Sequence, residues 1–93
     1  MDALEKVFGK TAQMTVLKCL MDHPDDFTYL SGIAEVTGLS HSSVARVIAP
    51  LIDANIVIEK PLGKQIRTFT INKENEATRL IMDFYTQLNV VLK

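Results

Sequence analysis

The chain has 93 residues, of which 47% are hydrophobic and 23% charged, and its formal net charge at pH 7 is −1. This length allows one domain over residues 1–93 with a single modest core, and the composition excludes a disordered chain. No apolar run is long enough to span a membrane, and the N-terminal residues lack the apolar segment of a secretory signal. A cytoplasmic protein that does not enter the membrane is therefore expected.

Two short helices are expected in the first part of the chain. Residues 2–8 place apolar side chains on one side of a helix. Residues 11–22 have apolar side chains at helical spacing, with Thr11 as the N-cap, and Pro24 stops this helix. Residues 27–29 are expected to form a short extended segment.

The stretch LSGIAEVTGLSHSSVARVIA, residues 30–49, predicts two helices joined by a tight turn. The helices are expected over 30–37 and 41–54, and Gly38 supplies the turn because a positive φ does not strain glycine. Ser40 is placed to cap the second helix. This is the geometry of a helix-turn-helix, whose second helix can enter the major groove of DNA.

A β-hairpin is expected directly after the second of these helices. A strand is expected over residues 56–60, which are rich in β-branched side chains, and another over residues 65–71, where side chains alternate with a period of two. Residues 61–64 are expected to form the turn between them. In the second strand Phe69 and Ile71 are expected to face inward. A hairpin in this place is a wing.

A last helix is expected over residues 75–92, with Asn75 as its N-cap. Its apolar stripe is wider than one small core needs, which favours a homodimer in which this is the dimerisation helix. The alternative is a helix that simply wraps its own domain. The residues expected at the dimer interface lie on this helix and on the first one, and they are Leu4, Phe8, Leu80, Ile81, Phe84, Leu88 and Val91.

The predicted fold class is mainly α with a small β-hairpin wing, a winged helix-turn-helix with N- and C-terminal flanking helices. The stretches GKTAQMTVLKCLMDHP, IAEVTGLSHSSVARVIAPLIDANIVIEK and FTINKENEATRLI carry this order over most of the chain. They resemble the small winged-helix transcriptional regulators of the MarR/ArsR-like superfamily, particularly compact archaeal-type members. The resemblance implies a homodimer that binds double-stranded DNA at an operator and represses or activates transcription.

The sequence departs from this family pattern in two ways. Pro50 stands inside the second motif helix, removes the hydrogen bond to the Arg46 carbonyl, and is expected to bend the helix after its first two turns. The cysteine or histidine–carboxylate clusters of ArsR-type metal sensors are missing from the sequence, so no metal is expected.

The residues expected to contact DNA lie on the second motif helix and on the wing. Arg46 is the candidate for a bidentate contact with guanine, and a surface ion pair with Asp53 or Glu59 is its alternative. On the wing, Lys60, Lys64 and Arg67 are expected at phosphates or at the minor groove, or else they form an ordinary charged hairpin tip. The full expected set is Ser40, His41, Ser42, Ser43, Ala45, Arg46, Lys60, Lys64, Gln65 and Arg67.

Catalysis fits the sequence badly, so neither an enzyme nor a cofactor is expected. The acidic residues around Pro24 are typical of a surface turn that ends a helix, and no second ligand cluster completes a metal site. The single cysteine, Cys19, lies in an apolar helical pattern. A disulfide framework is excluded because it needs at least two cysteines. Cys19 also forms no recognisable nucleophile–base pair with the two histidines.

Two functions remain open from the sequence. The first is a dimeric, sequence-specific DNA-binding transcriptional regulator. The alternative is a winged-helix module for protein–protein interaction in a larger assembly, without direct DNA binding, and the near-zero net charge is compatible with it. The small polar residues at the start of the second motif helix and the basic wing favour the regulator.

Overall fold

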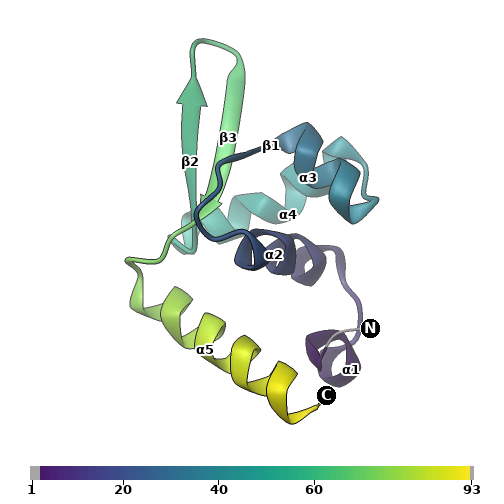
Figure 1. Cartoon of the computed structure of the whole chain (residues 1–93). Coiled ribbons are helices and arrows are strands. Elements are labelled where there is room, and N and C mark those ends of the chain that lie inside the picture. The colour runs from purple at the N-terminus through teal and green to yellow at the C-terminus, as the bar shows by residue number, and fades with distance from the viewer. Residues whose placement is uncertain (1–2, 93) are drawn as a thin grey trace.

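The computed structural model of the chain describes residues 3–92 and has the shape of a helical body with a projecting hairpin. The elements in chain order are α1 (Ala3–Phe8), α2 (Ala12–Asp22), β1 (Thr28–Tyr29), α3 (Leu30–Thr37), α4 (His41–Asp53), β2 (Val57–Leu62), β3 (Ile66–Ile71) and α5 (Glu76–Val91). Figure 1 shows the β2–β3 wing at one end of the molecule and α5 with α1 at the other. The predicted fold class is confirmed.

The helices α2, α3 and α4 pack around one core. Val16 of α2, Ile33 of α3 and Val44 of α4 are completely buried. Ala34, which is also buried, has no side chain beyond Cβ, so α4 can approach α3 closely at this point. The inward face of α4 continues through Val47, and this arrangement fixes the opposite face of α4 toward solvent.

The turn between α3 and α4 forms at the residues that the sequence indicates. Gly38 has a φ of 76°, and its N–H donates to the Ala34 carbonyl at 2.9 Å. The Ser40 hydroxyl accepts a hydrogen bond from the N–H of Ser43 at 3.1 Å, which caps α4. Both local predictions are confirmed.

Replacing Gly38 with alanine is expected to lower the free energy of unfolding by about 1–2 kcal/mol. An added Cβ would meet no other atom within 4 Å, so the whole loss comes from the positive φ. Gly38→Asn should lose less, because asparagine tolerates the left-handed region better than alanine. Urea unfolding measures both variants, and a loss for Gly38→Asn as large as that for Gly38→Ala would contradict the positive φ as the source of the cost.

The helix α4 continues through Pro50 to Asp53, because the proline leaves only one carbonyl of the helix without its usual donor. Its end is closed at Asn55, which has a φ of 61°. The N–H of Asn55 donates to the Ile52 carbonyl at 2.9 Å, and the N–H of Ile56 donates to the Leu51 carbonyl at 3.0 Å. These two bonds form a Schellman motif, which asparagine can close because it tolerates this conformation.

The sheet has the order β1-β3-β2 with antiparallel pairing throughout. The hairpin is longer than predicted: β2 runs to Leu62, so Pro61 lies in the strand opposite Arg67, and the turn is at residues 63–65. Proline is tolerated here because β2 is an edge strand. The extended segment at 28–29 is confirmed as β1, and it pairs with β3.

The second half of β3 is buried on both faces, which the sequence does not predict. Phe69 and Ile71 face the core as expected, but Thr68 and Thr70 are also buried. They lie on the other face between the flanking strands β1 and β2, and the Thr68 hydroxyl donates to the Lys60 carbonyl at 2.7 Å. Thr68 lies opposite Tyr29 and Lys60, and the Thr70 hydroxyl donates to the Pro24 carbonyl at 3.5 Å, so the flanking strands and the segment before β1 cover this part of the face.

The helix α5 is capped by Asn75, whose side chain accepts from the N–H of Ala77 at 2.8 Å, as predicted. One side of α5 packs on the core, with Ile81, Met82, Tyr85 and Leu88 partly buried there. The hydroxyl of Tyr85 donates to an oxygen of Asp22 at 2.7 Å and ties α5 to α2. Within residues 3–92 no helix combines the length and apolar character needed to cross a membrane.

Candidate nucleic-acid interface

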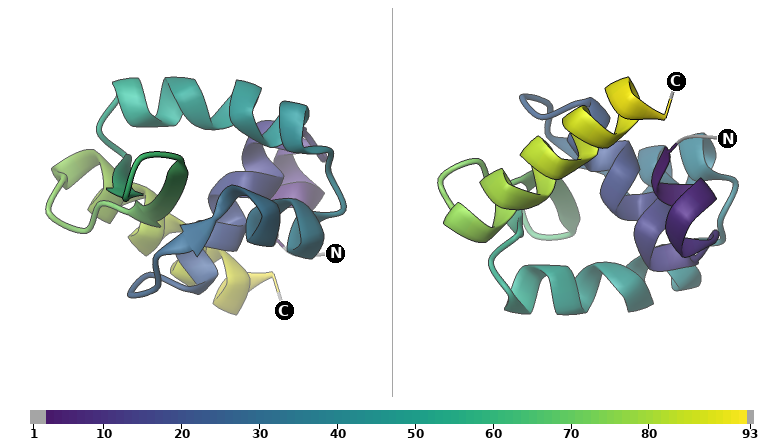
Figure 2. Two further views of the ribbon diagram at one scale, coloured as in Figure 1. Left: turned by 90° about the horizontal axis from the view of Figure 1, so that it is seen from above. Right: turned by 90° about the horizontal axis from the view of Figure 1, so that it is seen from below.

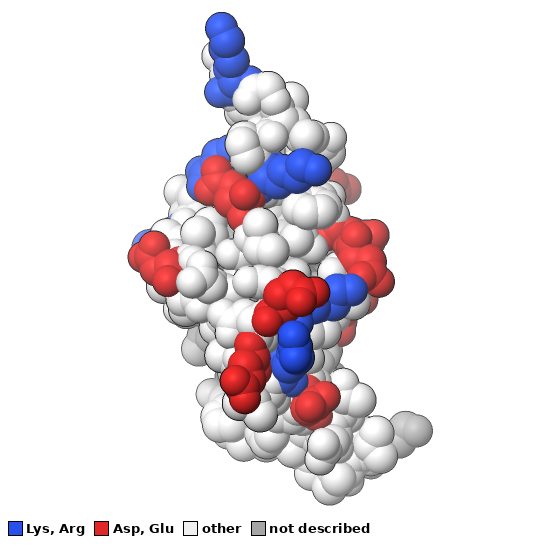
Figure 3. Space-filling view, turned by 90° about the vertical axis from the view of Figure 1, so that its left-hand side faces the viewer, with Lys and Arg blue, Asp and Glu red and all other residues white. Residues whose placement is uncertain are grey.

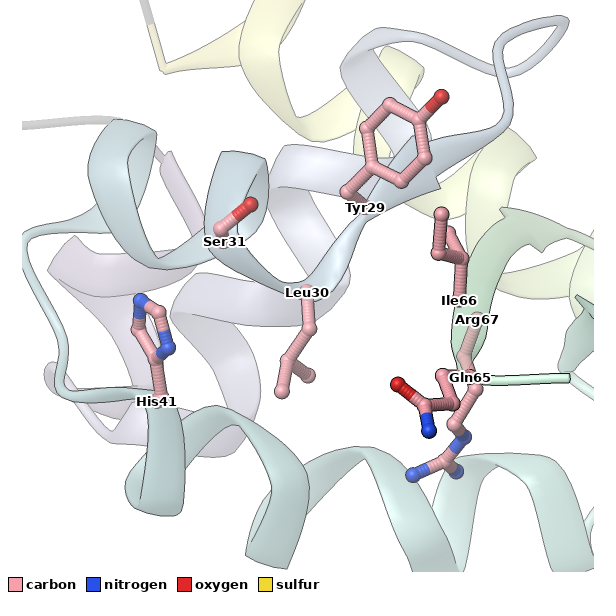
Figure 4. A pocket seen from close by; sticks show the side chains of 7 residues that line it. All are labelled: Tyr29, Leu30, Ser31, His41, Gln65, Ile66 and Arg67. Carbon is pink, nitrogen blue, oxygen red and sulfur yellow. The ribbon is translucent and has the colours of Figure 1, made fainter. Parts of the chain in front are cut away.

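An open groove of about 380 Å³ separates the start of α3 and the start of α4 from the wing (Figure 4). Three of the predicted contact residues, His41, Gln65 and Arg67, line it together. The other lining residues are Tyr29, Leu30, Ser31 and Ile66. In Figure 4 the Arg67 side chain extends from β3 toward α4, while His41 stands at the other end of the groove. The groove therefore joins the two elements that the sequence assigned to DNA.

The exposed edge of α4 contains the residue predicted to read a base. Arg46 is exposed, as are Ser42 and Ala49, which lie one turn before it and one turn after it. Among residues 3–92, Arg46 makes no ion pair, so the predicted alternative of a bridge to Asp53 or Glu59 is not formed. Its guanidinium is available to an outside acceptor.

The hydroxyls at the start of α4 are partly used by the protein itself. The Ser40 hydroxyl donates to the Ser43 hydroxyl at 2.9 Å in addition to capping the helix. The Ser42 hydroxyl lies 3.2 Å from that of Ser40 and remains exposed. Ser43 and Ala45 are half-buried. Ser40 is exposed as well but caps the helix, so Ser42 is the exposed hydroxyl that does not serve as the helix cap.

The basic residues of the wing are divided between its two faces and its tip. Lys64 lies in the exposed turn, and Figure 3 shows basic atoms at the far end of the wing. Lys60 lies on the face away from α4, with its Nζ 5.3 Å from the centroid of the Phe27 ring. Arg67 points to the opposite face, because residues 60 and 67 belong to opposite sides of the pleat. The structure therefore separates Lys60 from the groove.

Arg67 is held by an acidic partner that the sequence analysis did not assign to it. Its Nε and Nη2 donate to the two carboxylate oxygens of Glu59, each at 2.8 Å. The hydrogen bond from Arg67 lowers the pKa of Glu59, and the same bond raises the pKa of Arg67. The guanidinium also lies 5.2 Å from the centroid of the Phe69 ring. Arg67 is therefore a neutralised, oriented group rather than a free cation at the tip.

The sequence would have predicted this ion pair if the first strand of the hairpin had been extended to residue 62. In the observed register Glu59 lies opposite Phe69 and Pro61 opposite Arg67, so Glu59 and Arg67 are diagonal neighbours on one face. With the turn placed at 61–64, this relation is hidden. In Figure 3 acidic and basic side chains lie close together below the wing, in keeping with the low net charge.

The residues predicted for a dimer interface fall into two groups. Phe8, Leu80, Phe84 and Val91 are exposed, by 57%, 66%, 48% and 76% respectively. The rings of Phe8 and Phe84 lie 6.3 Å apart and join α1 to α5. In contrast, Leu4 is buried in the core of its own chain, and Ile81 and Leu88 pack partly against that core. The apolar surface of α1 and α5 therefore contains the first group, together with Val7, Val90 and Leu92, which are exposed as well.

Cys19 and the acidic turn show no sign of chemistry. Cys19 is half-buried, and burial raises the pKa of its thiol, to which nearby Asp22 adds. A thiol of this kind is protonated and unreactive at neutral pH. Over residues 3–92 no group of three or more histidine, cysteine or acidic side chains is placed to hold a metal ion.

The fold that results is a winged helix, and the solved structures that share it include a MarR-family regulator. The structure of AF1382 from Archaeoglobus fulgidus matches with a TM-score of 0.73 at 14% identity, over 96% of this chain and 97% of that one. A MarR-family transcriptional regulator from Rhodococcus sp. RHA1 matches with a TM-score of 0.69 at 17% identity, over 96% of this chain and 61% of that one. The MepR–DNA complex of Staphylococcus aureus matches with a TM-score of 0.68 at 16% identity, over 92% of this chain and 68% of that one.

These structural similarities show a shared fold. At the level of sequence no family model matches the chain, and no curated protein does. This chain spans 61% of the length of the Rhodococcus regulator, so that protein has further structure outside the winged helix shared with this chain.

Proposed function

We propose that this protein is a regulator of transcription that binds a specific sequence of double-stranded DNA as a homodimer. The observation that carries the proposal is the groove between α4 and the wing, bordered by His41, Gln65 and Arg67 and continued by the exposed edge of α4. When a helix enters the major groove of DNA, a hairpin beside it can contact the adjacent minor groove at the same time. The MarR-family regulator and the MepR–DNA complex among the structural neighbours support the same function.

The charges of this face support specific contacts more than a general attraction to phosphate. The net charge is −1, and Arg67 is neutralised by Glu59. Arg46 and Lys64 form no ion pair within residues 3–92, so they are the cations that this face can offer to DNA. A small number of phosphate contacts predicts a shallow dependence of affinity on salt.

The homodimer is supported by the uncovered apolar stripe of α5. Leu80, Phe84 and Val91 recur at helical spacing on the exposed side, and Phe8 of α1 extends the stripe. Figure 3 shows a largely uncharged surface at the lower end of the molecule. A two-fold axis through this surface would present two copies of α4 to an inverted repeat.

Arg46→Ala is expected to weaken binding to a selected DNA site by about 1–3 kcal/mol and to relax the preference at one base pair, because a bidentate contact to guanine is lost. Lys64→Ala should instead weaken binding to all sequences alike and lower the salt slope by about one unit per subunit. Binding to matched and mutated duplexes over a salt series measures both effects.

Lys10→Ala serves as the control for loss of an exposed positive charge, since Lys10 lies between α1 and α2, far from the wing in the chain and outside the groove. It should leave affinity and preference unchanged. If Arg46→Ala behaves like this control, α4 does not read DNA and the proposed function is wrong.

One observation favours the second candidate, a protein-docking module. The face of the sheet that turns away from α4 exposes five large apolar side chains, each exposed by between 41% and 51%. They are Phe27, Tyr29, Ile58, Leu62 and Ile66, of which Tyr29 and Ile66 also border the groove. A surface of this kind is typical of an interaction site. Serine at Ile58 and Leu62, which do not line the groove, should leave DNA binding intact in the regulator, whereas it should abolish partner binding in a docking module.

A further inference from the structure

Asparagine side chains join the end of α4 to the start of α5. The carbonyl of Asn55, which closes α4, accepts hydrogen bonds from the side-chain amide of Asn72 at 2.8 Å and from that of Asn75 at 3.0 Å. The amide of Asn75 also donates to the Ala54 carbonyl at 3.2 Å. The carbonyls that directly follow the last turn of the proposed recognition helix thus bind the segment that begins the proposed dimerisation helix.

Asn75 uses both ends of its amide in this junction. Its Nδ2 donates to the two carbonyls of residues 54 and 55, while its Oδ1 accepts from the N–H of Ala77 and caps α5. An amide has two donor hydrogens and one acceptor oxygen, and here each has a partner. Because the group is planar and rigid, it fixes the end of one helix directly to the start of the other.

The junction matters because the two helices lie apart over the rest of their length. In Figure 2, α4 and α5 run along opposite sides of the molecule. α5 has 16 residues and is therefore about 24 Å long. Its later turns are tied to α2 through Tyr85 and to α1 through Phe84, so loosening the junction at its start displaces the end of α4 relative to α5. In a dimer formed by α5, that displacement changes the distance between the two copies of α4.

We infer that Asn75 is a positioning residue: it sets the separation of the two recognition helices in the dimer and, through it, the spacing of the DNA half-sites that the protein accepts. The inference rests on the proposed function. It assigns to the α4–α5 junction a role in choosing DNA sites that requires no contact with DNA.

Asn75→Asp tests the inference because it separates the two uses of the side chain. Aspartate caps a helix as well as asparagine does, so the bond from Ala77 is kept. It has no donor for the carbonyls of residues 54 and 55, so the link to α4 is lost. Asn72→Asp removes one of the three donor bonds and is the milder variant. Asn55→Asp is the matched control, since it adds the same charge in the same junction while the backbone carbonyl that accepts the bonds stays in place.

The first measurement is affinity for duplexes taken from a site selection with the wild-type protein. One series carries the inverted repeat with its spacer changed by single base pairs, and another carries a single half-site. Wild type should prefer one spacing, with the avidity gain of about 10²–10⁴ over the half-site that simultaneous binding provides. Asn75→Asp should lose about tenfold of that gain at the best spacing and should discriminate less between spacings, with unchanged affinity for the half-site.

The second measurement needs no DNA. Spin labels at Ala49, an exposed position of α4, report the distance between the two recognition helices in a Cys19→Ala background. The distance distribution should be broader in Asn75→Asp than in the wild type, intermediate in Asn72→Asp, and unchanged in Asn55→Asp. Thermal unfolding identifies any variant that fails to fold, in which case Asn72→Asp decides.

The outcomes separate the inference from the function on which it rests. If folded Asn75→Asp keeps the wild-type spacing profile and distance distribution, the inference is wrong while the proposed function stands. Equal losses on the half-site and on the inverted repeat also overturn it, because they indicate damage to α4 itself. If the wild type binds no duplex, or is a monomer, the proposed function fails and the inference fails with it.

Discussion

Phe84→Asp is expected to convert the proposed homodimer into folded monomers. Phe84 is 48% exposed on α5 and lies beside Phe8 in the uncovered apolar stripe. In the proposed dimer the new carboxylate would leave water for an apolar interface without a partner, which costs roughly 3–5 kcal/mol in dimer stability. Sedimentation over micromolar concentrations measures the change, and affinity for an inverted repeat should fall toward that for a half-site.

Thr86→Asp is the control for charge on the same helix, since residue 86 is exposed and points away from the stripe. It should remain dimeric, and both variants should unfold at temperatures close to that of the wild type. A wild-type chain that sediments as a monomer throughout this range would contradict the homodimer directly.

Phe69→Ala is expected to remove about 3–5 kcal/mol from the free energy of unfolding. Phe69 is fully buried on β3 and is the largest side chain with that degree of burial. Its removal loses apolar contacts and leaves a cavity between the sheet and the helices. Because the stability of a domain is only about 5–15 kcal/mol, this single change should remove a large part of it. Chemical denaturation at equilibrium gives the value.

Ile66→Ala provides the comparison on the same strand. Ile66 is 51% exposed near the tip of the wing, so its truncation should cost less than about 1 kcal/mol. A loss as large as that of Phe69→Ala would mean that the wing, rather than the base of the sheet, supports the core.

The elements of this fold are predictable because their signals are local. Gly38 and Ser40 form the turn and the cap between the two motif helices, and Asn75 caps the last one. Each of these residues acts within four positions of itself, through its own φ or through a hydrogen bond to the next turn. The inward face of α4 follows from the helical period in the same way.

The candidate site is less predictable, because it depends on which strand lies beside which. Glu59 pairs with Arg67 only in the register that β2 and β3 adopt. The same pleat carries Lys60 to the face away from the groove, although it was expected beside Arg67. A shift of one residue in register would exchange the two faces, and no short stretch of sequence determines that register.

The sequence by itself therefore determines the order of helices and strands, their caps and the side of each helix that is buried, since these depend on neighbours within one or two turns. The tertiary structure alone decides that β1 and the segment before it cover Thr68 and Thr70 of β3, and that Glu59 neutralises Arg67. It also decides that asparagines 72 and 75 bind the end of α4. These contacts join residues far apart in the chain, and their geometry exists only once the core has fixed the elements against one another.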